Sequence, residues 1–284
     1  MHKKPPSRAG QHYSPEKRHG RPHPPKTHGP GRDPARPAPP FRRPSAQVAV
    51  LYGFHAVREA LRAKRRRLLS LYATPAAAAR LEAECAAAGI VAQIVEPHDL
   101  DRRLGAEPVH QGVLLEAEPL PALSLDTIET KSGLVLVLDQ ITDPHNVGAI
   151  IRTAAAFAVD ALVTTERHAP ELTGTLAKAA SGGLEHVAII SVVNLARALE
   201  ELGELGYLRV GLDSAAPIPL EEATLTRPVA LVLGAEDKGL RRLSRENCDV
   251  LARLDMPGAI KSLNVSNACA VGLSLVRARL PDAS

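Results

Sequence analysis

The chain has 284 residues and a formal net charge of +4, but this charge is divided unevenly along it. Residues 1–46 carry 11 lysines and arginines against two acids, and they hold 12 of the 24 prolines. A segment of this composition buries too little apolar surface to offset its ordering entropy, so we expect a disordered basic tail. The chain has no run of about 18 apolar residues, which argues against a membrane span.

Residues 47–118 alternate short apolar segments with Ala- and Leu-rich helical patterns. Strands are predicted over 48–52, 68–72, 90–95 and 112–116, and helices over 55–63, 76–88 and 97–104. Pro75 stands where proline opens a helix, and Gly89 where glycine ends one. We therefore predict a small α/β domain over 47–118, followed by a proline-containing linker over 119–132.

The first predicted helix ends in a run of five basic residues. Two interpretations remain open for it, a solvated charged face or a set of contacts to nucleic-acid phosphates. The five residues are Arg62, Lys64, Arg65, Arg66 and Arg67.

Residues 133–284 form a second unit with longer apolar segments. Strands are predicted over 134–138, 161–165, 187–192, 208–212, 229–233 and 250–254, and most of these are continuously apolar. Such runs are typical of parallel strands covered on both faces. Helical patterns occupy 149–157, 172–180, 195–205 and 265–280. The pattern predicts an open α/β sheet with ligand sites at the carboxyl ends of its strands.

Two common chemistries are disfavoured by the residue spacing. The turn after the strand at 134–138 has one glycine, and the chain has no GxGxxG or GxxxxGK[ST] at such a turn, which argues against a nicotinamide-dependent dehydrogenase. Cys85, Cys248 and Cys269 are scattered, so we expect neither a disulfide framework nor a metal site, and a reducing compartment is favoured. Cys269 could be a nucleophile, but a small buried apolar residue is the favoured interpretation.

Polar residues instead gather after three predicted strands, at 139–152, 234–239 and 254–267. Taken singly, each segment could be an ordinary turn or helix cap. The carboxyl ends of parallel strands share one sheet edge, so together the three segments predict a ligand site there.

These segments resemble the three motifs of the SpoU (TrmH) family of RNA ribose 2′-O-methyltransferases, within the SPOUT superfamily. The third motif departs from the family pattern because Met256 precedes Pro257 rather than following it. The matching residues are Asn146, Gly148, Arg152, Thr153 and Ala154; Leu233, Gly234, Ala235, Glu236 and Gly239; and Ser262, Leu263, Asn264, Val265 and Ser266.

The resemblance implies an α/β trefoil-knot methyltransferase domain over 133–284, preceded by an RNA-binding domain similar to ribosomal protein L30e. Residues 52–61 and 110–113 resemble parts of that domain. Within the family, the chain is most similar to bacterial enzymes that methylate a guanosine of 23S rRNA in the P loop of the peptidyl-transferase centre. Two alternatives stay open: a relative acting on tRNA or another rRNA nucleotide, and a non-catalytic RNA-binding factor for ribosome assembly.

The resemblance also implies S-adenosylmethionine as cofactor, no metal, a homodimer formed through the knot domain, and a cytoplasmic enzyme. Arginine stays protonated in proteins, so Arg152 is expected to hold the substrate phosphate and ribose oxygen rather than act as a base. Asn146 and Asn264 are expected to orient Arg152 and the hydroxyl, Glu236 to position Arg152 or the substrate, and Ser262 to fix the third motif. Cofactor contacts are expected from Gly234, Leu254, Met256 and Leu263.

Overall fold

The computed structural model describes residues 41–43, 45–105, 108–129, 132–167, 169–172, 174–236 and 238–280. Nearly all of the predicted basic tail lies outside these residues. Among the described helices, none is both long and apolar enough to cross a membrane.

The first domain is built on a four-stranded sheet with the order β1-β4-β2-β3. Strand β4 pairs antiparallel with both β1 and β2, and β3 joins β2 in parallel. The strands are β1 (Ala49–Tyr52), β2 (Leu68–Ala73), β3 (Ala92–Ile94) and β4 (Val113–Ala117), and the helices are α1 (Phe54–Ala63), α2 (Pro75–Arg80), α3 (Glu82–Ala88) and α4 (Pro97–Leu104). The predicted small α/β domain is therefore confirmed.

The single helix predicted over 76–88 is divided in two. Helix α2 begins at Pro75 behind the N-cap Thr74, and it ends where Leu81 leaves helical geometry with φ −105° and ψ 6°. Leu81 is fully buried, and its N–H donates to the carbonyls of Ala77 and Ala78. The chain thus restarts as α3 after a turn that places Leu81 in the core.

The second domain contains a seven-stranded sheet with the order β7-β6-β5-β10-β8-β11-β9. All of its strand pairs are parallel, as the apolar runs predicted. The strands are β5 (Leu134–Asp139), β6 (Ala161–Thr165), β7 (Ala188–Val192), β8 (Leu208–Leu212), β9 (Ile218–Pro219), β10 (Val229–Gly234) and β11 (Val250–Arg253). Strand β9, with only two residues, was not predicted.

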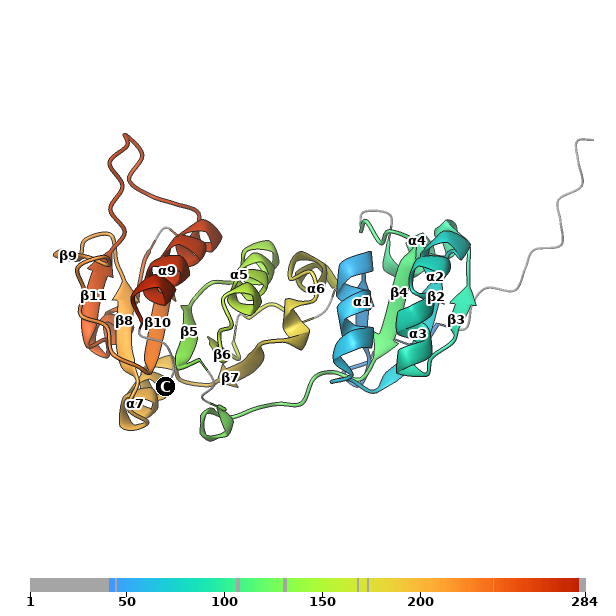
Figure 1. Ribbon diagram of the computed structural model, residues 1–284, viewed down its shortest axis with the longest axis horizontal. Coiled ribbons are helices and arrows are strands. Elements are labelled where there is room, and N and C mark those ends of the chain that lie inside the picture. Colours follow the sequence, from blue (N-terminus) through green and yellow to red (C-terminus); the bar gives the residue numbers. More distant parts are fainter. Residues whose placement is uncertain are drawn as a thin grey trace, which may run out of the picture. The chain divides into compact units, whose positions relative to one another are not determined.

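Helices cover both faces of this sheet (Figure 1). Alternate residues of β5 point to opposite faces: Leu136 packs in a core with α5 and α9, and Val137 packs in a second core with α7. Helices α5 (Pro144–Ala156) and α6 (Gly174–Ala179) pack together, α5 also contacts α9 (Val265–Arg279), and α7 (Leu195–Glu204) contacts β8. Short helices η2 (Gly183–Glu185) and α8 (Arg242–Glu246) complete the domain, and η1 (Leu125–Thr127) lies in the segment that precedes it.

Order and register place the polar segments at one edge. Strands β5 and β10 are neighbours and pair Leu138 with Leu233 and Asp139 with Gly234, so their carboxyl ends coincide. Strand β8 lies between β10 and β11. The segment between β11 and α9 extends from this edge as a long loop (Figure 1). The α/β class and its parallel sheet are confirmed, and the trefoil knot stays a prediction.

Candidate active site

Three side chains from the three motif segments meet in one hydrogen-bonded group. Asn264 Nδ2 donates to Glu236 Oε1 at 2.6 Å and to Asn146 Oδ1 at 2.9 Å. Asn146 Nδ2 makes a longer contact of 3.4 Å with the same Glu236 oxygen. The backbone N–H of Val265 also donates to that oxygen, at 2.9 Å, so Glu236 caps the start of α9. Residues 118 positions apart in the chain are thus brought together, as the motif assignment predicts.

Asn146 reaches this group from a helix and not from the expected turn. Helix α5 begins at Pro144, and the Asp143 side chain caps it by accepting from the N–H groups of His145 and Asn146. The prediction that the helix begins near residue 149 was therefore wrong. An Asp-Pro pair is a typical N-cap and first-turn signature, and it was the signal available in the sequence.

Gly148 is required by packing between helices. A Cβ at this position would lie 2.5 Å from Ala179 Cβ and 2.7 Å from the Leu176 carbonyl oxygen, both on α6. The glycine therefore lets α5 approach α6 closely. The ordinary turn considered for this segment from sequence does not explain its place.

Arg152 lies one helical turn after Gly148 and is exposed. Its Nη1 donates to Ser181 Oγ at 3.5 Å. Arg152 donates no hydrogen bond to Asn146, Asn264 or Glu236, the residues expected to orient or position it. The guanidinium is thus left with donors free for a substrate, and its one long hydrogen bond among the described residues is to Ser181, which was not predicted.

The third motif loop is closed by a lysine. Lys261 Nζ donates to the Met256 carbonyl oxygen at 2.6 Å and ties one end of the loop to the other. Ser262, to which this role was assigned, is exposed and lines a cavity without a hydrogen bond to a described residue. The structure therefore replaces Ser262 by Lys261 in holding the loop.

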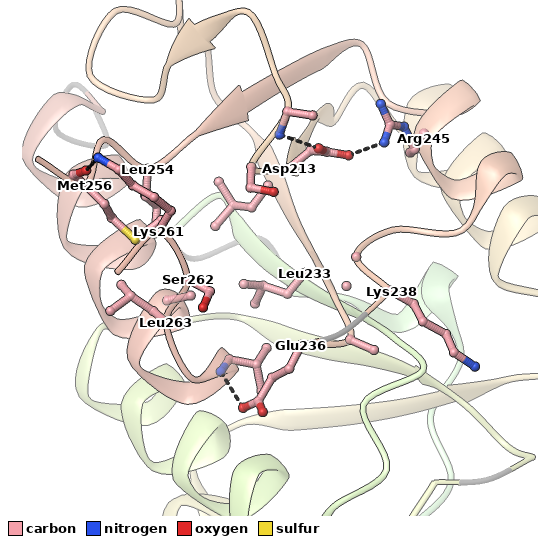
Figure 2. Close-up of a pocket in the computed structure, with 18 residues that line it drawn as sticks. Asp213, Leu233, Glu236, Lys238, Arg245, Leu254, Met256, Lys261, Ser262 and Leu263 are labelled. Carbon is pink, nitrogen blue, oxygen red and sulfur yellow. Dashed lines mark hydrogen bonds and ion pairs between the residues drawn. The ribbon is translucent and has the colours of Figure 1, made fainter. Parts of the chain in front are cut away.

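That cavity, of about 370 Å³, lies over the carboxyl ends of β10, β8 and β11. All four residues predicted to contact a cofactor line it: Gly234, Leu254, Met256 and Leu263. Figure 2 shows apolar side chains, among them Leu233, around its interior. The volume is within the usual range for small-molecule sites, roughly 300–1,000 Å³.

Gly234 forms part of the wall of the cavity. A Cβ there would lie 2.2 Å from the carbonyl carbon of Gly239 and 2.4 Å from the backbone nitrogen of Leu240. The loop that carries Glu236 therefore folds directly over the end of β10, closed by a hydrogen bond from Gly239 N to Ala235 O at 2.8 Å. Apolar side chains and backbone supply part of the wall, which suits a flat heterocyclic ligand.

A charged pair lines the same cavity and was not predicted. Asp213 follows β8 and forms an ion pair with Arg245 at 2.5 Å (Figure 2). The other Asp213 oxygen accepts from Ala215 N at 2.8 Å, which fixes the turn after the strand. An acid directly after a buried parallel strand was the available signal, because ligands bind at that edge.

The remaining chemistry-bearing residues do not join the site. Burial raises the pKa of Cys269, within α9, to about 12, so it behaves as a buried apolar residue. Among the residues that the structure describes, no group of three or more His, Cys, Asp or Glu side chains could hold a metal ion.

Most of the basic run is engaged within the chain. Arg62 contacts Glu84 at 2.6 Å, the buried Arg66 contacts the buried Glu185 at 2.7 Å, and Arg67 contacts Glu118 at 3.1 Å. Arg65 donates to the Glu185 carbonyl oxygen. Arg66 is buried, whereas the other four side chains are exposed, so most of the run lies on a solvated face whose charges are partly paired with acids of the chain.

Comparison with known proteins identifies the family. Sequence models match residues 133–274 for the SpoU rRNA Methylase family and residues 50–123 for RNA 2′-O ribose methyltransferase substrate binding. The chain belongs to the SpoU rRNA methylase family. It is therefore a methyltransferase, and its first domain corresponds to the family's substrate-binding domain.

Two relatives and one solved structure illustrate the likeness. The 23S rRNA (guanosine-2′-O-)-methyltransferase RlmB of Yersinia pestis is 40% identical over 243 residues, which cover 81% of this chain and 97% of the relative. RlmB of Pseudomonas aeruginosa is 39% identical, with 83% and 99% covered. The fold is similar to that of the SpoU methyltransferase AviRb from Streptomyces viridochromogenes, with a TM-score of 0.69, 22% identity, and 82% and 91% of the two chains covered.

Proposed function

We propose that the chain transfers a methyl group from S-adenosylmethionine to the 2′-hydroxyl of a ribose in RNA. The proposed target is a guanosine of 23S rRNA in the P loop of the peptidyl-transferase centre. The observation that carries this proposal is the meeting of Asn146, Glu236 and Asn264 beside the cavity of Gly234 and Leu263, in a chain 40% identical to a 23S rRNA guanosine methyltransferase.

The cavity fits the proposed cofactor. Leu233, Leu254 and Leu263 supply apolar walls for an adenine, and the backbone at Gly234 and Ala235 supplies polar groups at its edge. The few aromatic residues of the chain are consistent with recognition by backbone rather than by stacking. S-Adenosylmethionine supplies a methyl group activated by a positively charged sulfur, so the protein has to align the acceptor and assist loss of its proton.

Arg152 is proposed to bind the acceptor RNA. A guanidinium remains protonated, so it can hold a phosphate or ribose oxygen and stabilise negative charge that develops on the hydroxyl oxygen. The proton then passes to water or to a phosphate oxygen. Asn146, Glu236 and Asn264 are proposed to hold the acceptor at the mouth of the cofactor cavity, since their mutual hydrogen bonds fix their positions.

Arg152→Ala tests this assignment. We expect methyl transfer from labelled S-adenosylmethionine to rRNA to fall by at least about 100-fold, the usual scale for one oxyanion-stabilising donor. Cofactor affinity measured by calorimetry should stay unchanged. Arg197→Ala is the matched control, because Arg197 is exposed on α7, which packs in the second core, away from α5 and α9. Near-normal turnover of the Arg152 variant would refute the assignment, and mass spectrometry of the product identifies the methylated nucleotide.

Four further statements complete the proposal. We propose a division into a basic tail over 1–46, a substrate-binding domain over 47–118, a linker over 119–132 and a methyltransferase domain over 133–284. The tail is proposed to attract RNA through its charge. A homodimer through the methyltransferase domain is supported by Val271, which is 42% exposed on α9, and by the half-buried Ala268 and Leu275 at helical spacing beside it. A cytoplasmic location is supported by three free cysteines.

A further inference from the structure

A second cavity, of about 440 Å³, adjoins the proposed cofactor cavity at the same sheet edge. It lies over the carboxyl ends of β7, β6, β5 and β10, whereas the cofactor cavity lies over β10, β8 and β11. The two cavities share Ala235, Glu236 and Lys238 as a common wall. The second cavity is lined by Gln140, Thr142, Thr165, Arg167, Val193, Ala235, Glu236, Lys238 and Arg241.

Three cationic side chains line this second cavity and are available to a ligand. Arg167 and Lys238 are exposed, and neither side chain has a partner among the described residues. Figure 2 shows Lys238 pointing away from the interior of the cofactor cavity. In contrast, Arg62, Arg66 and Arg209 each form a close ion pair with an acid. Two cations without a partner among the described residues therefore line this cavity.

Arg241, the third cation lining the cavity, is held in place by a buried carboxylate. Its Nε donates to Asp139 Oδ1 at 2.6 Å and its backbone N–H to Asp139 Oδ2 at 2.9 Å. Asp139 is fully buried at the end of β5, so the guanidinium is anchored to the sheet. Its two terminal nitrogens bond no described residue and remain free as donors. An anchored guanidinium loses little side-chain entropy when it binds an oxyanion.

The carboxylate of Glu236, in the common wall, does not occupy the donors of these three cations. Glu236 is the acid among the described residues that line the second cavity. Its Oε1 accepts from Asn264 Nδ2 and Val265 N, on the side of α9. The hydroxyl of Thr142 and the amide of Gln140 add neutral donors. The cavity thus offers charged and neutral donors around one space, the chemistry that recognises a phosphate.

We infer that this cavity binds a backbone phosphate of the RNA substrate next to the nucleotide that is methylated. The inference rests on the proposed function, because a methyltransferase needs its acceptor beside the cofactor. The common wall meets this need: Glu236 belongs both to the second cavity and to the Asn146–Asn264 group. A phosphate held by Arg167, Lys238 and Arg241 would fix the register of the strand, so that one ribose faces the cofactor cavity.

The experiment measures RNA affinity against salt for the full chain and for Arg167→Ala and Lys238→Ala. Each variant should bind a short 23S rRNA fragment about tenfold more weakly at low salt, and its plot of log affinity against log salt should be shallower by roughly 0.7–0.9. Calorimetric affinity for S-adenosylmethionine should not change in Arg167→Ala, because Arg167 lines the second cavity and not the cofactor cavity. Both side chains are exposed, so melting temperatures should equal that of the wild type.

Arg197→Ala is the control, since it removes an exposed arginine on α7 and should leave the salt slope unchanged. If wild type methylates the fragment and both variants keep its affinity and slope, the phosphate site is refuted and the proposed function stands. If wild type binds the fragment with the expected slopes but transfers no methyl group, the proposed function fails while the phosphate site stands. A loss of cofactor affinity in Arg167→Ala would also overturn the inference.

Discussion

Gly234→Ala tests the cofactor cavity, and the size of its expected effect can be worked out from the structure. The added methyl group would lie 2.2 Å from the carbonyl carbon of Gly239 and 2.4 Å from the nitrogen of Leu240. Carbon atoms in contact are about 3.5–4.0 Å apart, so the backbone of 239–240 has to retreat by roughly 1.5 Å. Backbone atoms cannot turn aside as a flexible side chain can, so the loop over 235–239 has to move.

The consequences reach Glu236, which lies on this loop. Its hydrogen bonds to Asn264 and Val265 measure 2.6 and 2.9 Å, and N–H···O bonds in proteins rarely exceed about 3.2 Å. A shift of this size breaks them and closes part of the cavity. Overpacking of this kind costs about 1–3 kcal/mol of folding free energy, equivalent to a fall in melting temperature of several degrees. We expect cofactor affinity to fall at least about tenfold, or about 1.4 kcal/mol.

The assay is calorimetric titration with S-adenosylmethionine, together with thermal unfolding. Gly258→Ala is a matched control on the third motif loop. A Cβ at Gly258 would have no atom within 4 Å, and the residue has no positive φ. This control should bind the cofactor like the wild type. Wild-type affinity and melting temperature in Gly234→Ala would refute the reasoning, because they would mean that the close approach of β10 and its loop does not shape the cavity.

Two other predictions concern stability and thiol chemistry. Burial raises the pKa of Cys248 and Cys269 to about 12, so at pH 8 roughly one in ten thousand of these thiols is ionised and alkylation of the native chain should be very slow. Rapid labelling of these two cysteines in the native chain would contradict the raised pKa values. Since both pKa values lie above the usual 9, the stability contributed by the neutral thiols should be lost as pH rises from about 9 towards 12. Arg66→Ala leaves the carboxylate of Glu185, whose side chain is 2% exposed, without its partner and should cost about 3–5 kcal/mol in denaturant unfolding. Arg67→Ala, which removes an exposed pair, should cost less than about 1 kcal/mol, and equal losses would refute the distinction.

The sheet could be predicted from sequence because its signal is local. Continuous apolar segments such as 134–138 and 229–233 identified parallel strands, and the structure places strands there. The start of α5 was missed because the helical pattern was taken to begin at residue 149, after Asn146 and Gly148. What fixes Gly148 is the approach of Ala179 on another helix, and no local pattern reports a contact of that kind.

The sequence predicted which residues form the site better than it predicted which side chains bond one another. The motifs indicated that Asn146, Glu236 and Asn264 belong together, and they do. The partner of Arg152 proved to be Ser181, a residue 29 positions away that belongs to none of the three motifs. Such pairings depend on how helices pack on the sheet, and they follow from tertiary geometry rather than from spacing along the chain.

The distribution of charge limits where RNA affinity can come from. Beyond residue 46 the chain carries 24 bases against 29 acids, so its net charge repels a phosphate backbone. Several of those bases, including Arg62, Arg66 and Arg67, also form ion pairs with acids of the chain. Attraction therefore depends on cations that remain unpaired. Arg167 and Lys238 are proposed to supply them next to the site, and the basic tail is proposed to supply them at long range. On this proposal, different parts of the chain position the RNA and capture it.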